Sequence, residues 1–483
     1  MKNNFLIILL VLNISHLNNI LLPINIKEGI LFYYYTTLFF GEEKTPQTFI
    51  LDTTSSLVSS PCDMCQSCGV HSNEYFNISI PEEEVLNCSD SNCQSLSGNC
   101  ENQQCSYKFD YNENAYIKGI YINKEIRFKE NSTKSFNIPV GCTLNETNYI
   151  ITQESDGIMG LNNDENSFIN RLYKSSIISK NIFSICLNHN NTGYLSLGEM
   201  VTDYHLSEDI NYIPFTIDEE EKYYTVKIDS FEIGDSKIYY NGTAIIDSTA
   251  SLSSFPTKLF NLIVKELDTK CSEDVCGKLV ENKNFGLCAL FKNETIMINS
   301  IANWSDIKIN FGEYKFNWKS QNYWMDLSSE NYLRACLGFE SIEEDKITLG
   351  TTFLHGNDVI FDRNNKNIGL VESKCIADFI FTSKTSTNSM KSKTKIEYKI
   401  KQIPEKTREN VHPKIKRKKK SKKGIFIICL IIATIVSSII LIYYFMFCKR
   451  KKKFMVKKKK FDKVIKKKNK FKDREENILL NKN

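Results

Sequence analysis

Two short segments of this chain repeat one pattern, and the repeat constrains the fold more than any other feature. They are Phe49-Ile-Leu-Asp52-Thr-Thr-Ser-Ser56 and Ala244-Ile-Ile-Asp247-Ser-Thr-Ala-Ser251. Each runs from apolar, strand-forming residues into an aspartate and then into small hydroxyl-bearing residues. A carboxylate at the end of a buried strand is costly unless something satisfies or uses it. The repeat therefore predicts two lobes that each give one carboxyl group to a shared site, where the pair splits its proton affinities and activates a water.

The charge of the chain is divided between a large acidic part and a basic C-terminal part. Residues 391–483 hold 32 Lys and Arg against 7 Asp and Glu, whereas residues 1–390 hold 30 against 50. An acidic globular part is a poor partner for nucleic acid, so we expect no nucleic-acid binding. The lysine runs are typical of a solvated tail near anionic lipid.

Both ends of the chain carry apolar segments that predict targeting to a membrane. Residues 1–20 have the charged start and short apolar run of a signal peptide. Residues 425–447 are long and apolar enough for one transmembrane helix. They follow a Ser/Thr/Lys-rich stalk at 378–423 and precede a basic tail at 448–483. We expect a type I single-pass protein, with the ectodomain luminal (ER, Golgi or endolysosome) or extracellular and the tail cytosolic.

The cysteines support an oxidising compartment. Fourteen of the sixteen precede residue 376, and Asn-X-Ser/Thr sequons recur from Asn77 to Asn303. Seven cysteines crowd into an insert at 62–105, which begins with Cys62-x2-Cys65-x2-Cys68. This spacing is compatible with zinc, but the insert offers only His71 as a nearby imidazole, so we favour disulfides. Because seven is odd, one of these cysteines should pair outside the insert or stay free.

The hydrophobic pattern is mostly that of short β-strands. Residues 107–128 predict a hairpin with a polar turn at 112–114, and short strands recur through 210–255 and 306–371. Helices are expected over Ser167–Ile178 and Thr257–Leu267, the second after Pro256. We predict a mostly β, bilobal ectodomain with an N-terminal lobe at 30–205 and a C-terminal lobe at 206–377.

Several further segments carry a family resemblance when taken in order. They are Asp156-Gly-Ile-Met-Gly-Leu161, Leu349-Gly350 through Phe353-Leu354, Val359-Ile-Phe-Asp-Arg363 and Ile368-Gly-Leu-Val371. Together with the repeated aspartates they resemble the pepsin-like (family A1) aspartic proteases over about residues 31–375. The cysteine-rich insert is similar to that of the nepenthesin type and of the membrane-anchored plasmepsin V group, where these cysteines form disulfides.

The resemblance implies a function and roles for individual residues. It implies a monomeric endopeptidase that acts on polypeptides without a cofactor or metal, with Asp52 and Asp247 as the catalytic pair. Tyr111 would be the flap tyrosine that closes over the substrate. Thr53 and Ser248 would tie each loop to the opposite lobe, and Ser55 would bond the outer oxygen of Asp52. In the nepenthesin pattern, Cys142 and Cys186 would bridge the first lobe, and Cys375 would close the fold.

The chain departs from the family pattern at the site itself. The family has glycine two residues after each aspartate, where this chain has Thr54 and Thr249, and Ala250 lacks a hydroxyl that the family usually has. A Cβ at the glycine position would protrude into the cleft. Because the change is the same in both lobes, we interpret the site as unusual but working. The alternative is a pseudoprotease that binds peptides in the same cleft; a disulfide-bonded structural protein of the cell surface is a more distant possibility.

Overall fold

The computed structural model describes residues 20–27, 32–78, 84–96, 98–112, 115–188, 192–217, 220–282, 286–328 and 332–376. All of them belong to one compact unit. The predicted stalk, membrane segment 425–447 and basic tail lie outside the described residues, as does the expected signal peptide apart from Ile20. Within the described part of the chain, the helices are too short or too polar to cross a bilayer.

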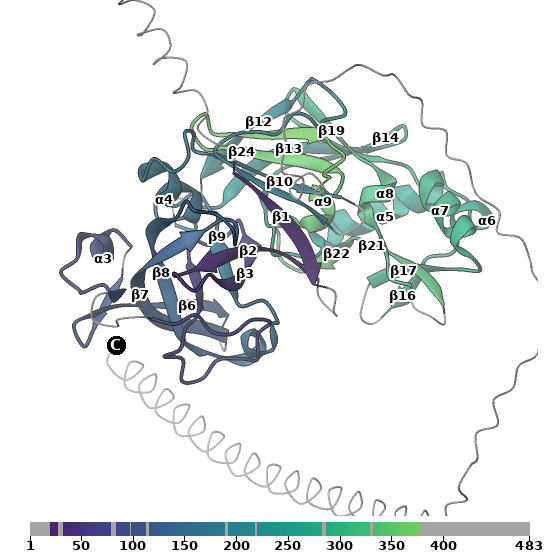
Figure 1. The fold of residues 1–483 in the computed structure, drawn as a ribbon. Coiled ribbons are helices and arrows are strands. Elements are labelled where there is room, and N and C mark those ends of the chain that lie inside the picture. The colour runs from purple at the N-terminus through teal and green to yellow at the C-terminus, as the bar shows by residue number, and fades with distance from the viewer. Residues whose placement is uncertain are drawn as a thin grey trace, which may run out of the picture. The chain divides into compact units, whose positions relative to one another are not determined.

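A central antiparallel layer joins the two halves of the molecule. Its strands run in the order β1 (Ile20–Lys27), β11 (Thr192–Leu197), β10 (Ile182–Leu187), β24 (Asn357–Asp362), β25 (Asn367–Glu372) and β12 (Asn211–Ile217). Strands from opposite ends of the chain therefore pair directly, and β10 and β24 cross the middle of Figure 1. The first strand among the described residues, β1, lies upstream of residue 30, where the first lobe was expected to start.

The first lobe contains the predicted hairpin and the site-bearing strand β3. The hairpin is formed by β6 (Gln104–Asn112) and β7 (Ala115–Arg127). The other elements of this lobe are β2 (Tyr33–Phe40), β3 (Thr45–Asp52), β4 (Val58–Pro61), α3 (Ser91–Ser95), β5 (Asn99–Glu101), β8 (Phe136–Glu146), η1 (Asn148–Thr152), β9 (Gly157–Gly160) and α4 (Phe168–Lys174). In Figure 1 these elements carry the purple and blue colours.

The second lobe repeats this plan and adds a small separate sheet. Its main sheet contains β13 (Tyr224–Ile233), β14 (Ser236–Ile246), β15 (Ser253–Pro256), β18 (Ile307–Phe311), β19 (Tyr314–Trp318), β22 (Phe339–Ile342) and β23 (Ile347–Leu349). The small sheet has the order β16 (Val280–Asn282), β17 (Gly286–Phe291), β21 (Leu333–Leu337) and β20 (Trp324–Asp326). The helices of this lobe are α5 (Thr257–Lys270), α6 (Glu273–Cys276), α7 (Glu294–Asn303), α8 (Ser320–Tyr323) and α9 (Thr351–Leu354).

Both predicted helices are confirmed, and their packing explains them. Helix α5 follows Pro256 and buries Leu259, Ile263 and Leu267, which are spaced four residues apart on one face. Helix α4 ends at Lys174, earlier than expected, and Ser176 just beyond it takes a positive φ of 55° that helix geometry does not allow.

The two lobes place their aspartates by the same local arrangement. Strand β3 pairs in parallel with β9, with Asp52 opposite Gly160, and β14 pairs in parallel with β23, with Ile246 opposite Leu349. The chain after each aspartate returns close to these partners. A Cβ on Gly160 would lie 2.4 Å from the Ser56 carbonyl carbon, and one on Gly350 would lie 2.3 Å from the Leu252 oxygen. Glycine is therefore required where each loop crosses its neighbouring strand.

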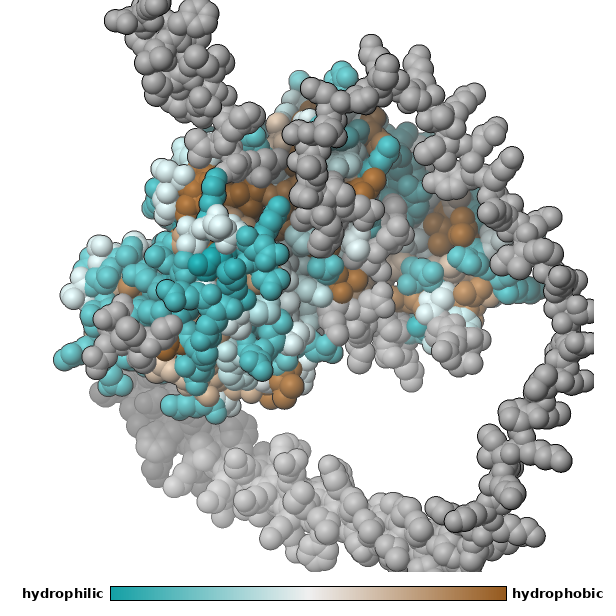
Figure 2. Space-filling view, in the orientation of Figure 1, coloured by the Kyte–Doolittle hydropathy of each residue, from teal (hydrophilic) through white to brown (hydrophobic). Residues whose placement is uncertain are grey.

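Apolar side chains fill both lobes and continue under the central layer. Phe183 of β10 and Phe361 of β24 stack with ring centroids 4.4 Å apart, and Tyr224 packs edge-on against Phe361. In the space-filling view, hydrophilic residues cover much of the visible face of the first lobe (Figure 2). The prediction of a mostly β, bilobal fold is confirmed.

All fourteen cysteines of the described residues form disulfides. The pairs are Cys62–Cys142, Cys65–Cys68, Cys88–Cys100, Cys93–Cys105, Cys186–Cys375, Cys271–Cys276 and Cys288–Cys336. The insert therefore uses its thiols for disulfides, which removes them as zinc ligands, and its odd cysteine pairs outside the insert.

The bridge expected between Cys142 and Cys186 is wrong. Cys142 lies on β8 beside β4, so it meets Cys62 at the end of β4, with Ser60 opposite Cys142 in the register. Cys186 lies on β10, whose partner β24 leads through β25 to Cys375. Cysteine counting leaves such connectivity open, and strand pairing decides it.

Candidate active site

Reciprocal hydrogen bonds between the lobes lock the two aspartate loops together. The Thr53 hydroxyl donates to the Ile246 carbonyl at 2.8 Å and accepts from the Ser248 amide at 3.0 Å. The Ser248 hydroxyl donates to the Leu51 carbonyl at 2.7 Å and accepts from the Thr53 amide at 3.1 Å. All these groups are buried, so each bond satisfies atoms that water cannot reach. Thr53 and Ser248 thus fix the positions of the Asp52 loop and the Asp247 loop relative to each other.

Each aspartate is held from one side. Asp52 Oδ1 accepts from the Thr54 amide at 2.8 Å, the Thr54 hydroxyl at 2.7 Å and the Ser55 amide at 3.2 Å. Asp247 Oδ1 accepts from the Thr249 amide at 2.8 Å, the Thr249 hydroxyl at 2.6 Å and the Ala250 amide at 3.3 Å. Among the described residues, every hydrogen bond to either carboxyl ends on Oδ1, which leaves Oδ2 as the atom able to bind a substrate or water.

The electrostatics separate the two carboxyl groups. Burial raises the pKa of Asp247, and the negative charge of Asp52 raises it further, against the lowering effect of the bonds from Thr249 and Ala250. A charge on Asp52 thus favours a proton on Asp247, as expected when two carboxyls are close enough to interact. Protonation of Asp247 therefore relieves the repulsion between the two carboxyls.

The side-chain hydroxyl that bonds Asp52 belongs to Thr54 and not to Ser55. The Ser55 side-chain oxygen is buried and has no hydrogen-bond partner among the described residues. Thr54 takes this contact instead, because its side chain turns back onto the carboxylate two residues before it. Ser55 contacts Asp52 through its backbone amide, at 3.2 Å, and not through its hydroxyl. The threonines that replace the family glycines are bonded to the aspartates in both lobes.

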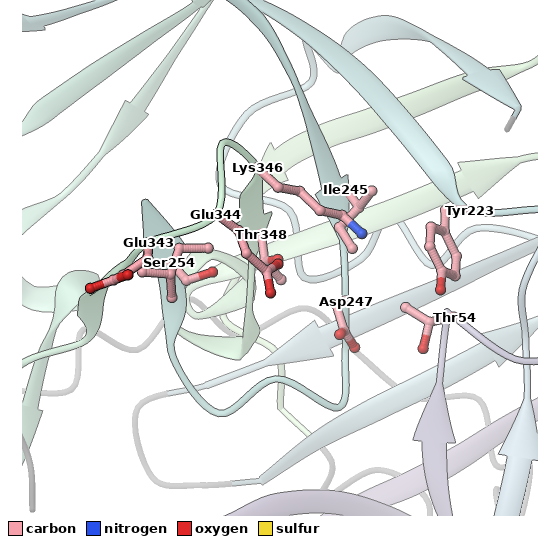
Figure 3. Close-up of a pocket in the computed structure, with 10 residues that line it drawn as sticks. Thr54, Tyr223, Ile245, Asp247, Ser254, Glu343, Glu344, Lys346 and Thr348 are labelled. Atoms are coloured by element: carbon pink, nitrogen blue, oxygen red, sulfur yellow. The ribbon is translucent and has the colours of Figure 1, made fainter. Parts of the chain in front are cut away.

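Two neighbouring cavities surround the carboxyls. The larger, of about 1040 Å³, is lined from both lobes and includes Asp52, Tyr111 and Thr249. The smaller, of about 560 Å³, is lined by Asp247 and mostly by second-lobe residues (Figure 3). Because Thr54 and Tyr223 line both cavities, the two adjoin beside the aspartate loops, and we call them together the groove. Concave sites of this volume are the usual place for a bound ligand.

Tyr111 lies on the hairpin strand β6 within the lining of the larger cavity. Its ring packs edge-on against Phe109 with centroids 5.0 Å apart, and its hydroxyl is buried without a hydrogen-bond partner among the described residues. Burial raises the pKa of Tyr111 well above its ordinary value, and the nearby charge of Asp52 adds to this. The structure thus brings Tyr111 to the Asp52 side of the site.

Tyr223 is a site residue that sequence reasoning missed. It directly precedes β13 in the second lobe, and its hydroxyl donates to Glu221 at 3.0 Å. Burial is the largest cause that raises the pKa of Tyr223. The hydrogen bond and charge of Glu221 and the charges of both aspartates raise it further. In Figure 3 its hydroxyl points toward Thr54, beside Asp247. No motif marked it among 23 tyrosines; only the fold brings it to the pair.

The bilobal β fold and the paired carboxyls define the class of pepsin-like aspartic proteases, and comparison with known families agrees with this class. Residues 34–199 match the family model described as "Xylanase inhibitor N-terminal", and residues 223–372 match "Xylanase inhibitor C-terminal". Together the two ranges span more than half of the chain. The chain thus contains TAXi-like domains of the pepsin family of aspartic proteases.

Two curated proteins and one solved structure are similar to this chain over most of its length. Plasmepsin V of Plasmodium falciparum is 24% identical over 457 residues, covering 77% of this chain and 76% of the relative. Aspartic proteinase-like protein 1 of Arabidopsis thaliana is 24% identical over 387 residues, covering 74% and 70%. The crystal structure of conglutin gamma from lupine seeds shares the fold, with a TM-score of 0.57 at 15% identity over 73% of this chain and 95% of that one.

Proposed function

We propose that this protein is an aspartic endopeptidase that hydrolyses peptide bonds with a water activated between Asp52 and Asp247. The observation that carries the proposal is the pair of matching loops, each presenting one carboxyl to a groove and each hydrogen-bonded to the other lobe through Thr53 and Ser248. A loop that only capped a strand would not need this cross-bracing.

The chemistry follows from the difference between the two carboxyls. Asp52, as the ionised partner, takes a proton from the water as the water attacks the scissile carbonyl carbon. Asp247, as the protonated partner, donates a proton to the carbonyl oxygen, so charge does not accumulate on the tetrahedral intermediate. The amine leaves after it receives the proton that Asp52 took from the water. Asp247 regains a proton from a hydroxyl of the tetrahedral intermediate as the carbonyl re-forms, which returns the dyad to one proton. The chain's own carboxyls supply all of the acid–base chemistry in this scheme.

The position of Tyr111 supports a role in covering the substrate. Its hairpin borders the larger cavity, and its hydroxyl has no partner within the described residues to hold it in place. A peptide lying in the groove would exchange water around Asp52 for contacts with this ring. Exclusion of water strengthens the electrostatic interactions of the dyad.

The proposal includes a membrane-tethered ectodomain in the secretory or endolysosomal system. It is supported by the apolar residues 425–447, the apolar start of the chain and the sequons, and by a protein fold rich in disulfides. Deletion of 425–447 should release the protein from membranes during alkaline carbonate extraction. Full retention of the deleted protein in the membrane pellet would contradict the tether.

The activity is tested with purified full-length protein and a peptide library at pH 4–7. Wild type should cleave internal peptide bonds and be blocked by a pepstatin-type inhibitor. Asp52→Asn and Asp247→Asn should each lose about a thousandfold or more in kcat while keeping the wild-type Tm. Asp156→Asn is a control for the chemistry, because Asp156 bonds Thr48 and Asn73 away from the pair; its Tm should fall while any folded fraction still cleaves. Equal turnover by wild type and Asp52→Asn would refute the dyad.

The second candidate function is a pseudoprotease that binds peptides without cleaving them. It is favoured by Thr54 and Thr249, whose side chains line the groove where the family has glycine. This alternative predicts that peptides bind to wild type and to Asp52→Asn alike, with no product from either. It also predicts that restoring glycine at both positions creates activity.

A further inference from the structure

We propose that Thr54 and Thr249 are positioning residues that hold the outer oxygens of the two aspartates, and that the lobes differ in whether another hydroxyl can replace them. The first lobe has a reserve hydroxyl in Ser55, whereas the second lobe has none. The inference rests on the proposed function and explains why the departures at 54 and 249 accompany an alanine at 250.

The contacts of the two threonines are the same in both lobes. Each threonine gives its amide and its hydroxyl to one carboxylate oxygen, with hydroxyl distances of 2.7 Å to Asp52 and 2.6 Å to Asp247. A hydrogen bond to an ionised group is short and strong. The threonine thus does more than occupy the space of a glycine, because it fixes which oxygen of each carboxyl is bonded to the loop.

The residue after each threonine is where the lobes differ. The amides of Ser55 and Ala250 reach the same oxygens as the threonines, at 3.2 and 3.3 Å. In the first lobe this residue is Ser55, whose hydroxyl is buried and has no hydrogen-bond partner among the described residues. Because the Ser55 amide already bonds Asp52 Oδ1, we assign this hydroxyl to the same carboxyl once the Thr54 hydroxyl is gone. Ala250 has no hydroxyl, so Thr249 is the sole side-chain donor to Asp247 within the described residues.

The asymmetry predicts which substitutions are tolerated. In Thr54→Gly, the Ser55 hydroxyl takes over the bond to Asp52, and kcat should fall by less than about threefold. In Thr249→Gly, nothing replaces the lost bond to Asp247, which becomes ionised as it donates its proton. The rate constant kcat should therefore fall by about tenfold to a hundredfold, the range expected for one hydrogen bond to a charged group. KM should change less than kcat, because the lost bond is to the carboxyl and not to the peptide.

Two double variants test, one in each lobe, whether the neighbouring hydroxyl decides the loss of kcat. Ala250→Ser added to Thr249→Gly supplies the missing hydroxyl and should restore most of kcat. Ser55→Ala added to Thr54→Gly removes the reserve and should lower kcat as far as Thr249→Gly does. Thr54→Ser and Thr249→Ser keep the hydroxyl and should stay within about threefold of wild type, which controls for the lost methyl group.

A pH profile separates positioning from a general effect on the fold. The Thr249 hydroxyl stabilises the ionised form of Asp247, so its loss should raise the pKa of that carboxyl. The alkaline limb of kcat/KM, where the protonated acid is lost, should move up by about one pH unit in Thr249→Gly. It should return in the Ala250→Ser rescue and stay in place in Thr54→Gly.

The experiment uses full-length protein with acid-denatured haemoglobin as substrate, and each variant is checked by its Tm. The inference is overturned if Thr249→Gly equals or exceeds wild type, or if Ala250→Ser fails to rescue a folded Thr249→Gly protein. If wild type does not cleave any substrate, the proposed function fails instead. The inference is then tested by the 13C titration of Asp247, whose midpoint should rise in Thr249→Gly; an unmoved midpoint overturns it.

Discussion

His71 holds the cysteine-rich insert against the wall of the groove, and replacing it should destabilise the protein in a pH-dependent way. Its Nε2 lies 2.9 Å from Glu146, and its Nδ1 lies 3.0 Å from the carbonyl oxygens of both Gln153 and Ser155. The side chains of His71 and Glu146 are 1% and 3% exposed. Every group within reach of the ring is an acceptor, so both ring nitrogens must carry protons.

The charges around His71 set the direction of its pKa. Burial lowers the pKa, but the hydrogen bond and charge of Glu146, the charge of Asp156 and the carbonyl of Gln153 outweigh it and raise the pKa above the ordinary 6.5. Tyr75 is a further titratable neighbour, and its ring centroid lies 6.2 Å from that of His71. Since the folded pKa is raised, the stabilisation is complete below the unfolded pKa and is lost as the pH rises through the folded pKa.

The magnitude follows from the burial of the pair. His71→Leu leaves Glu146 with the Gly69 amide, at 3.0 Å, as its remaining donor among the described residues. Removing one partner of a buried pair costs about 3 to 5 kcal/mol. With an unfolding entropy of about 2.1 cal/mol/K per residue over residues 20–376, this corresponds to a fall in Tm of roughly 4 to 7 °C.

The assay is thermal unfolding of wild type and His71→Leu between pH 5 and pH 8.5. The Tm difference should be largest at pH 5 to 6 and should shrink as the pH rises, because only wild type loses the contribution of the charged imidazole. Lys174→Leu is the control, since its ion pair with Glu165 is solvent-exposed and such pairs contribute little. A Tm difference that is absent, or constant across the pH range, would refute the reasoning.

Three further substitutions test other parts of the account. Tyr111→Phe should leave the free energy of unfolding unchanged or raised by up to about 1 kcal/mol, because it removes a buried hydroxyl without a partner in the described residues. Ser248→Ala should cost about 1 to 3 kcal/mol, because the Thr53 amide and Leu51 carbonyl lose their partner. Arg363→Met should cost roughly 2 to 3 kcal/mol, because this side chain bonds Asn163, Ser167 and Asn181 of the first lobe. Urea unfolding measures all three, and an unchanged midpoint for Ser248→Ala or Arg363→Met, or a clear loss for Tyr111→Phe, would contradict them.

The sequence predicts the lobes and the carboxyl pair because these depend on local patterns that occur twice. A strand that ends in an aspartate is visible in the eight residues 49–56, and the second copy at 244–251 excludes a chance match. The helix after Pro256 is predictable for the same reason, since the spacing of its apolar residues defines its buried face.

Other parts of the site depend on how distant segments meet, and the sequence does not contain that information locally. Thr54 reads as a loss of glycine until its hydroxyl is seen on Asp52. Tyr223 and His71 have no motif. His71 bonds Glu146, which lies 75 residues along the chain, and Tyr223 bonds the local Glu221 but comes near Asp52 and Asp247 only through the fold. The pairing of Cys186 with Cys375 requires knowing that β10 lies beside β24.

The most direct test of the central claim is the carboxyl titration of Asp247, followed by 13C NMR in wild type and in Asp52→Asn. The account predicts a raised midpoint in wild type, because burial and the charge of Asp52 both oppose ionisation. It predicts a lower midpoint in Asp52→Asn, where the charge is gone. An ordinary midpoint that does not move between the two proteins would contradict a coupled pair of carboxyls across the groove.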